Sequence, residues 1–138
     1  MIETEINKVN SAEQTKKPKA GEIYKCAFYE ETIGTEIKGP RPVLIISENW
    51  YNEEGNRIIV LPLTRYFNKQ GRPKPFYVWE IRVKVGNQEG KIMVDQVHSL
   101  DKERLGEKVA DLSSELLEKV MVNLKKLMVF KDKVKAKL

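Results

Sequence analysis

The sequence predicts a mainly β fold, a small antiparallel barrel followed by a C-terminal amphipathic helix, on three observations. Short runs rich in β-branched and aromatic residues recur at regular intervals from Gly21 onward. Connections rich in Gly, Pro and Asn separate these runs. Near the C-terminus, an apolar stripe of helical period replaces this pattern. A chain of 138 residues has the length of one ordinary domain and can bury a core of its own.

The predicted elements follow one another in a simple order. Residues 1–19 are polar and rich in Glu, Gln, Asn and Lys, which is typical of a flexible N-terminal arm. The barrel domain with its helix is expected over residues 20–131, with strands in the runs EIYKCAFY, RPVLIIS, RIIVLPLT, FYVWEIRV and KIMVDQVHSL. Gly34 and Gly39 mark the first connection, and YNEEGN, NKQGRPKP and GNQEG mark the next ones as turns.

The C-terminal helix is predicted from a cap and an apolar stripe. Ser113 is a typical N-cap residue, and Glu115 follows in the first turn. Apolar residues then recur with helical spacing at Leu116, Leu117, Val120, Met121, Leu124, Leu127 and Met128. We expect this stripe to pack on the barrel, the alternative being a face reserved for a partner. Residues 132–138 form a basic tail.

Composition excludes several classes of protein. No apolar run approaches the roughly 20 residues that span a bilayer, and the first residues lack the apolar core of a secretory signal. We therefore expect a cytoplasmic protein with no membrane partner. Cys26 is the sole cysteine, so the chain has no second thiol for a disulfide or a CxxC pair. We interpret Cys26 as a core residue rather than a reactive thiol.

Motifs of metal- and cofactor-dependent enzymes are absent from the sequence. The chain has one histidine and one cysteine and no HxxH, CxxC or HExxH spacing, so no metal ligands are expected. Its eight glycines match neither a Walker loop nor a dinucleotide fingerprint. No GxSxG elbow precedes a helix. We therefore expect neither a metal nor an organic cofactor.

Positive charge is concentrated in one part of the chain. The formal net charge is +5, and the stretch from Thr64 to Lys91 alone carries seven basic residues against two acidic ones. No acidic residue occurs between Arg65 and Lys74. Such a stretch is either a solvated loop beside an exposed strand face or a surface that binds anions such as nucleic acid.

Arg41 lies between two prolines at the start of the apolar run VLIIS. Proline biases the residue before it toward extended backbone, and Pro42 fits the first position of a strand because it lacks an N–H. The guanidinium is therefore expected on a rigid part of the barrel rim. Its planar donors match phosphate oxygens and can stabilise charge in a transition state. The alternative is a surface arginine that pairs with Glu36 or Glu48.

Three further polar residues occur at the expected ends of strands. Thr64 ends RIIVLPLT, where its hydroxyl could cap a local turn or donate to a phosphate oxygen. Gln96 and His98 are two residues apart, so in a strand they share one face. A lone histidine is commonly structural, yet a Gln and a His beside a basic surface could hydrogen-bond to nucleobase edges. Both interpretations stay open on the residues alone.

Taken in order, these motifs resemble the MazF/PemK family of toxin endoribonucleases over about residues 20–130. The matching features are an opening Gly-Glu-Ile, the loop Gly34-Thr35-Glu36, Gly39 followed by Arg41-Pro42, the Pro-x-Thr that ends at Thr64, and Asp95-Gln96 leading to Asp101. The resemblance implies an SH3-like antiparallel barrel of the CcdB/PemK type, a symmetric homodimer and a cognate antitoxin. It also implies metal-independent cleavage of single-stranded RNA by 2′-hydroxyl attack, which leaves 2′,3′-cyclic phosphate and 5′-hydroxyl ends.

The resemblance also assigns roles to single residues. Arg41 matches the family's essential arginine, Thr64 its catalytic threonine, and Glu36 the acidic residue of the first loop. Arg41 is expected to stabilise charge on the phosphorane, and Thr64 to hold a non-bridging oxygen. RNA contacts are expected from Thr35, Lys38, Arg65, Lys69, Arg72, Gln96 and His98.

Some features depart from the family or leave another class open. His98 stands where relatives tend to carry Arg or Lys, which would make an RNA contact there weaker or dependent on pH. The basic loop 65–75 is variable in the family and is expected to tune the RNA sequence that is cut. The same barrel type also serves a toxin family that poisons DNA gyrase through its C-terminal helix, and an inert homologue would bind RNA or an antitoxin without cutting. Arg41 together with Thr64 favours the nuclease.

Overall fold

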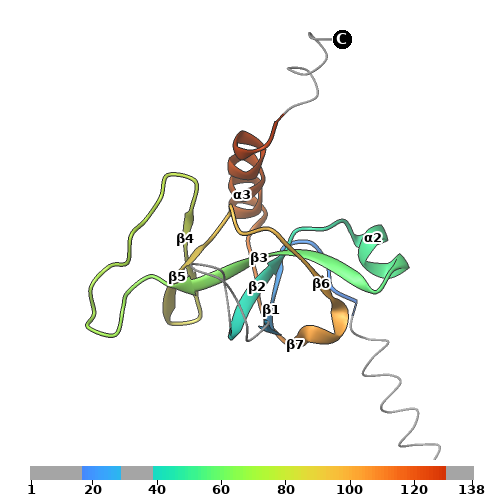
Figure 1. Cartoon of the computed structure of the whole chain (residues 1–138), viewed down its shortest axis with the longest axis horizontal. Coiled ribbons are helices and arrows are strands. Elements are labelled where there is room, and N and C mark those ends of the chain that lie inside the picture. Colours follow the sequence, from blue (N-terminus) through green and yellow to red (C-terminus); the bar gives the residue numbers. More distant parts are fainter. Residues whose placement is uncertain (1–16, 29–38, 130–138) are drawn as a thin grey trace, which may run out of the picture.

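An antiparallel sheet forms the body of the protein in the computed structural model, which describes residues 17–28 and 39–129 (Figure 1). Its strands are β1 (Glu22–Ala27), β2 (Pro40–Ile45), β3 (Arg57–Arg65), β4 (Ile81–Val85), β5 (Gln88–Ile92), β6 (His98–Asp101) and β7 (Leu105–Asp111). The helical elements are α2 (Asn49–Glu54), the 3-10 turn η1 (Lys102–Arg104) and α3 (Ser114–Leu127). Most of the predicted N-terminal arm and the whole basic tail lie outside the described residues.

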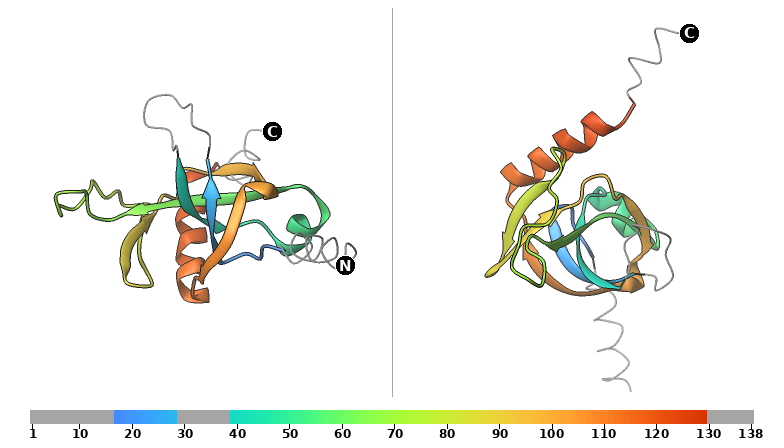
Figure 2. Two further views of the ribbon diagram at one scale, coloured as in Figure 1. Left: turned by 90° about the horizontal axis from the view of Figure 1, so that it is seen from below. Right: turned by 60° about the vertical axis from the view of Figure 1, so that its left-hand side comes forward.

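Strand β3 organises the sheet because it changes partners along its length. The strand order is β4-β5-β3-β2-β1-β7, with β6 also paired to β3. The first half of β3 pairs with β6, where Val60 lies opposite His98. Its second half pairs with β5, where Thr64 lies opposite Lys91. The sheet curls around this strand (Figure 2), and the predicted mainly β, barrel-like fold with a C-terminal helix is confirmed.

Both faces of the curled sheet carry buried side chains. Along β1 and β2, neighbouring residues alternate between two core clusters, one inside the curl and one beneath α3. The inner cluster contains Cys26, which is 3% exposed, so its interpretation as a core residue is confirmed. The outer cluster contains Ile23, Leu44, Leu61, Leu63, Ile92 and Val120.

Helix α3 begins where the sequence predicted, and part of its predicted apolar stripe packs on the sheet. The Ser113 hydroxyl accepts a hydrogen bond from the Leu116 N–H at 3.2 Å, as an N-cap does. Val120 is fully buried, and Leu116, Leu117 and Leu124 pack partly buried against the outer cluster. These residues cover the outer cluster, whereas Met121, Leu127 and Met128 of the predicted stripe are exposed. Helix α3 lies beside the sheet (Figure 2). Within the described ranges, no helix is both long and apolar enough to cross a membrane.

Helix α2 occupies a segment where the sequence predicted a turn. Its buried residue is Asn52, whose Nδ2 donates to the carbonyl oxygens of Pro18 at 2.9 Å and Ser47 at 3.0 Å. The Ser47 hydroxyl bonds to the Asn52 side chain in turn. A short helix held by a hydrogen-bonded asparagine shows no apolar periodicity, so the pattern could not reveal it.

The strand prediction was wrong in three places. The run FYVWEIRV is a strand only from Ile81 onward. The run KIMVDQVHSL is divided between β5 and β6, because the Gln96 N–H donates to the Met93 carbonyl at 3.1 Å in a turn. Strand β7 was not predicted, since most of its side chains are exposed and its sequence lacks an apolar run.

Candidate functional site

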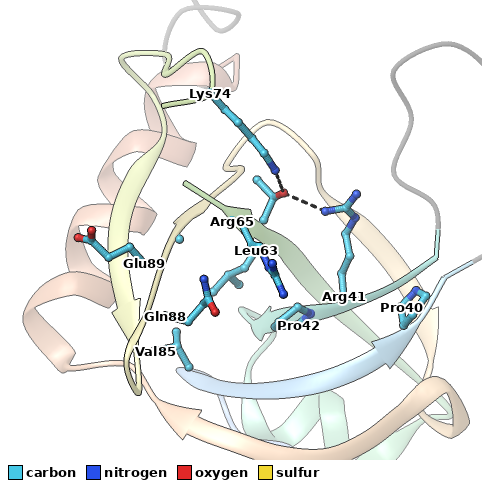
Figure 3. Close-up of a pocket in the computed structure, with 11 residues that line it drawn as sticks. Pro40, Arg41, Pro42, Leu63, Arg65, Lys74, Val85, Gln88 and Glu89 are labelled. Atoms are coloured by element: carbon cyan, nitrogen blue, oxygen red, sulfur yellow. Dashed lines mark hydrogen bonds between the residues drawn. The ribbon is translucent and has the colours of Figure 1, made fainter. Parts of the chain in front are cut away.

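A pocket of about 440 Å³ opens where the second half of β3 meets β2 and the β4–β5 hairpin. Its lining comes from four segments that are far apart in the sequence (Figure 3). These are Pro40, Arg41 and Pro42 of β2, Leu63, Thr64 and Arg65 of β3, Lys74 of the β3–β4 loop, and Val85, Gln88, Glu89 and Gly90 of the β4–β5 hairpin. The basic residues of this lining make the pocket cationic.

Arg41 is fixed to this pocket by its backbone and its head group. Its Cα lies opposite Cys26 of the buried β1 strand, and its Nη1 donates to Thr64 Oγ1 at 2.9 Å. Arg41 does not form the ion pair with Glu48 that the sequence left open as an alternative. Glu36, the other possible partner, lies outside the described residues. The Arg41 Nε is buried and finds no hydrogen-bond partner within residues 17–28 and 39–129. The Arg41 guanidinium therefore has an N–H donor that the described residues do not use.

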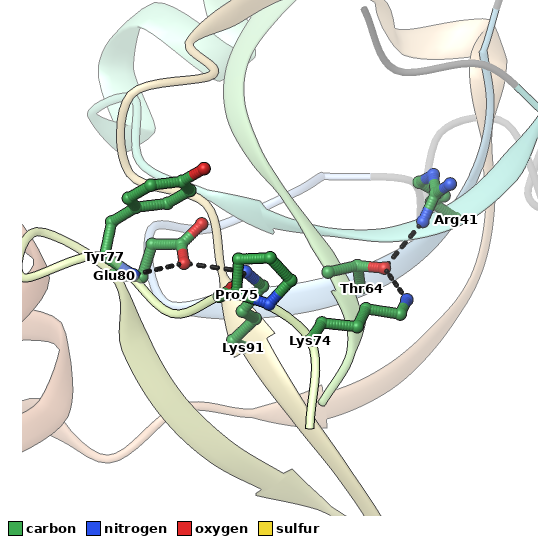
Figure 4. A network of polar contacts seen from close by, with 7 residues as sticks. All are labelled: Arg41, Thr64, Lys74, Pro75, Tyr77, Glu80 and Lys91. Carbon is green, nitrogen blue, oxygen red and sulfur yellow. Dashed lines mark hydrogen bonds and ion pairs between the residues drawn. The ribbon is translucent and has the colours of Figure 1, made fainter. Parts of the chain in front are cut away.

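Lys74 is the pocket residue that sequence reasoning did not single out. Its Nζ donates at 3.0 Å to Thr64 Oγ1, the same hydroxyl oxygen to which Arg41 donates (Figure 4). Burial and, after it, the nearby charges of Arg41, Lys91 and Arg65 lower the pKa of Lys74. Only the basic run NKQGRPKP hinted at this residue, and that run could not tell Lys74 from its basic neighbours.

Thr64 joins the two cations. A hydroxyl oxygen has two lone pairs, and both are engaged here by Arg41 and Lys74. The Thr64 hydrogen is consequently directed elsewhere and can be donated to a bound acceptor. The alternative of a local turn cap is not supported, because within the described residues this hydroxyl bonds to the side chains of Arg41 and Lys74.

A buried ion pair lies directly behind Thr64. Lys91 Nζ contacts Glu80 Oε1 at 2.7 Å, with 7% and 4% of the two side chains exposed. The same ammonium donates to the Pro75 carbonyl, and the other partner of Glu80 Oε1 is the Tyr77 N–H at 3.0 Å (Figure 4). This network ties β5 to the chain on both sides of residue 76, next to Lys74.

Gly90 lets β5 approach β3 closely enough to build the pocket wall. A Cβ at this position would lie 2.8 Å from the carbonyl oxygen of Thr64, closer than such atoms pack. Because that neighbour is backbone, any side chain here must displace the strand that carries Thr64. The glycine is thus required by the site geometry.

The remaining predicted residues are divided between several places. Arg65 lines the pocket, whereas Lys69 and Arg72 lie exposed on the β3–β4 loop, which extends away from the sheet (Figure 1). Gln96 is in a turn, so the expectation that it shares a strand face with His98 was wrong. Thr35, Glu36 and Lys38 lie outside the described residues.

His98 is not brought to the pocket within this chain. It pairs with Val60, four residues before Thr64 on β3, or about 13 Å along an extended strand. Its Nδ1 lies 2.8 Å from the Gln96 carbonyl, and its ring meets Phe28 edge-on at 5.2 Å. These contacts hold the imidazole beside the middle of β3.

The fold and site define a small curled-sheet protein with a cationic pocket at one end of its longest described strand. The family model described as PemK-like, MazF-like toxin of type II toxin-antitoxin system matches residues 19–128, and the chain belongs to this family. A curated relative is Endoribonuclease EndoA of Bacillus subtilis (strain 168). It is 29% identical over 102 residues, which cover 74% of this chain and 86% of that protein.

Solved structures agree with this assignment. The crystal structure of MazF (Form-I) from Deinococcus radiodurans superposes with a TM-score of 0.65 and 27% identity, covering 80% of this chain and 94% of that one. The MazE-MazF (Form-III) structure from the same organism gives a TM-score of 0.62 and 25% identity, covering 80% of this chain and 95% of that one. The family resemblance of the sequence is confirmed.

Proposed function

We propose that this MazF-type toxin is an endoribonuclease that cleaves single-stranded RNA at short sequences without a metal or another cofactor. The observation that carries this proposal is the convergence of Arg41 and Lys74 on the Thr64 hydroxyl. Among the described residues, no carboxylate forms an ion pair with either cation. A pocket with uncompensated positive charge favours an anion, and RNA offers a phosphodiester at every step. The Bacillus relative's name, an endoribonuclease, supports the same activity.

The chemistry requires positioning and charge stabilisation rather than a protein nucleophile. The 2′-hydroxyl of the RNA attacks the adjacent phosphorus, and a 2′,3′-cyclic phosphate and a 5′-hydroxyl are formed. Arg41 stabilises the charge that develops on the phosphorane, because its planar donors match phosphate oxygens. The Thr64 O–H donates to a non-bridging oxygen, since both lone pairs of its oxygen are already engaged.

RNA beyond the scissile phosphate follows the basic surface. Arg65 at the pocket edge and the exposed Lys69 and Arg72 contact neighbouring phosphates of a single strand. By the family resemblance, Glu36 serves the reaction and Thr35 and Lys38 bind RNA. His98 lies opposite Val60, four residues before Thr64, so its RNA contact within the same chain involves nucleotides away from the pocket. Gln96 contacts RNA from the turn in which its N–H donates to the Met93 carbonyl.

The proposed partners are an antitoxin and a second copy of the chain. The structural relatives include MazE-MazF complexes from Deinococcus and a mycobacterial endoribonuclease with its cognate antitoxin. We infer that a cognate antitoxin covers the cationic pocket with an acidic segment and so competes with RNA. We also infer a symmetric homodimer. Sedimentation of the purified chain at micromolar concentration should report a dimer, and a monomer alone would contradict this inference.

The activity is tested with purified protein and single-stranded RNA in the presence of EDTA. The wild type should cut the RNA, and Arg41→Ala should slow cleavage by about 10²-fold or more, because a donor to the transition-state charge is lost. Arg57→Ala is the matched control. Arg57 is an exposed arginine at the start of β3, and its guanidinium donates to Ser99, away from the pocket. Uncut RNA with folded wild type, or equal rates for both variants, would overturn the proposal.

A further inference from the structure

The proposed cleavage needs a proton donor for the oxygen that leaves the phosphorus. As the phosphorus–oxygen bond to the 5′-oxygen breaks, that oxygen leaves as an alkoxide unless a group protonates it. Arg41 and Arg65 hold their protons too strongly to act as acids. The Thr64 hydroxyl would itself become an alkoxide. Lys74 is the remaining basic side chain of the pocket lining.

Two other titratable residues are badly placed for this task. Glu89 lines the pocket, but it accepts a hydrogen bond from Arg82 at 3.0 Å, and its carboxylate points away from the place where Arg41 and Lys74 meet (Figure 3). His98 lies opposite Val60, four residues or about 13 Å along β3 from Thr64. Neither can reach a phosphate that is held by Thr64.

The Lys74 ammonium lies where such a phosphate must bind. Its Nζ is 3.0 Å from Thr64 Oγ1. Two groups bonded to the same hydroxyl oxygen lie about 5 Å apart or less. A phosphate oxygen that accepts the Thr64 hydrogen is therefore within about 5 Å of Nζ. A small rotation of the lysine brings the ammonium to the 5′-oxygen, which is attached to the same phosphorus.

The loop that carries Lys74 is tied to the sheet. The Lys74 N–H donates to the Tyr66 carbonyl at 2.9 Å, and Phe67 and Pro73 form an antiparallel bridge. The next carbonyl, that of Pro75, accepts from the buried Lys91 ammonium. The Lys74 backbone is thus held on both sides, and its side chain is delivered to the pocket by hydrogen bonds of the fold.

The charges around Lys74 favour loss of its proton. Arg41 faces it from β2, Arg65 from the end of β3 and Lys91 from β5. Two carboxylates of this region are engaged elsewhere: Glu80 pairs with Lys91, and Glu89 pairs with Arg82. Burial, followed by these positive charges, lowers the pKa of Lys74 from its ordinary value of 10.5.

We propose that Lys74 is the general acid of RNA cleavage, a catalytic residue that protonates the departing 5′-oxygen. The inference rests on the proposed function. The bond between the 2′-oxygen and phosphorus forms while the bond between phosphorus and the 5′-oxygen breaks, and the electron pair of the broken bond stays on the 5′-oxygen. That oxygen takes a proton from Lys74 Nζ and becomes the 5′-hydroxyl. The 2′-hydroxyl proton passes to hydroxide from the solvent, and water then reprotonates Lys74 and regenerates hydroxide.

The experiment compares two RNA substrates that differ in one atom. One carries the natural 5′-oxygen at the scissile position, and the other carries a 5′-sulfur, which leaves as a thiolate without protonation. Lys74→Ala and Lys74→Met should slow single-turnover cleavage of the oxygen substrate by about 10²- to 10⁴-fold. The same variants should cut the sulfur substrate within a few-fold of the wild type. Circular dichroism establishes that both variants are folded, and Lys119→Ala, a change of an exposed α3 lysine, is the matched control.

Two further measurements, the pH dependence of the rate and the affinity for RNA, distinguish proton transfer by Lys74 from an effect of its positive charge alone. The wild-type rate should rise with pH and then level off below pH 10.5, as Lys74 loses its proton. Lys74→Arg keeps the charge but not the acid, so it should neither restore the rate on the oxygen substrate nor show this levelling. Affinity for RNA with a 2′-deoxy nucleotide at the cleavage site should change little in Lys74→Arg.

The possible results distinguish the two proposals. Equal defects of Lys74→Ala on both substrates, or full activity of Lys74→Arg, would overturn the general-acid role while cleavage itself stands. Wild-type protein that cuts neither substrate would overturn the proposed function, and the general-acid role with it.

Discussion

Two lysines lie close to Thr64 at the end of β3, and their surroundings differ. Lys91 is buried and pairs with Glu80 at 2.7 Å, and it also donates to a backbone carbonyl. Lys74 is only half-buried and donates to the Thr64 hydroxyl, with no ion-pair partner in the described part of the chain. The charge of Lys91 is satisfied within the fold, whereas that of Lys74 is available to a ligand.

The difference separates structural charge from functional charge in one small region. A buried cation without a carboxylate is costly, so a chain that keeps Lys91 must also keep Glu80. A cation at a pocket edge stays hydrated and needs no partner until an anion binds. Both lysines occur in a stretch that looks uniformly basic in the sequence, and only their partners distinguish their roles.

The largest expected effect on stability comes from breaking the buried pair. Lys91→Ala leaves the Glu80 carboxylate buried without its cation and should lower the free energy of unfolding by about 3–5 kcal/mol. Urea denaturation measures this loss. The double variant Lys91→Met/Glu80→Gln removes both charges and should recover much of it. A single variant as stable as the wild type would show that Lys91 is not structural.

A smaller loss of stability is expected from adding a side chain at Gly90, where β5 approaches β3 closely. In Gly90→Ala the new Cβ would lie 2.8 Å from the Thr64 carbonyl oxygen, and the strand must shift at a cost of about 1–3 kcal/mol. Because that strand carries the Thr64 hydroxyl, RNA cleavage should fall as well. Gly55→Ala is the control, since its Cβ would meet only the Arg57 nitrogen at 3.9 Å. Equal stability of the two variants would contradict this account of the pocket wall.

The sequence predicted those parts of the fold that carry a periodic pattern. The alternating runs around Val43 and Val60 and the helical stripe around Val120 bury side chains as expected. Helix α2 could not be predicted, because the polar Asn52 holds it. Strand β7 is largely exposed and has little apolar pattern to detect.

The site was predictable only in part, for a similar reason. The prolines around Arg41 indicated a rigid rim arginine, and in the structure its guanidinium donates to the Thr64 hydroxyl. Lys74 was hidden among other basic residues, since its position depends on a loop that returns to β3 through backbone hydrogen bonds. The expected grouping of Gln96 with His98 on one strand face failed at a turn that the sequence did not mark.

The central claim is that the Thr64 hydroxyl, where Arg41 and Lys74 meet, holds the scissile phosphate of RNA. It is tested most directly by single-turnover cleavage of single-stranded RNA in EDTA with Thr64→Val and Thr64→Ser. Valine keeps the shape of the side chain but removes the hydroxyl, so cleavage should fall by about 10²- to 10³-fold in a folded protein. Serine keeps the hydroxyl and should retain cleavage within about tenfold of the wild type. A folded Thr64→Val variant that cuts RNA at the wild-type rate would contradict the claim.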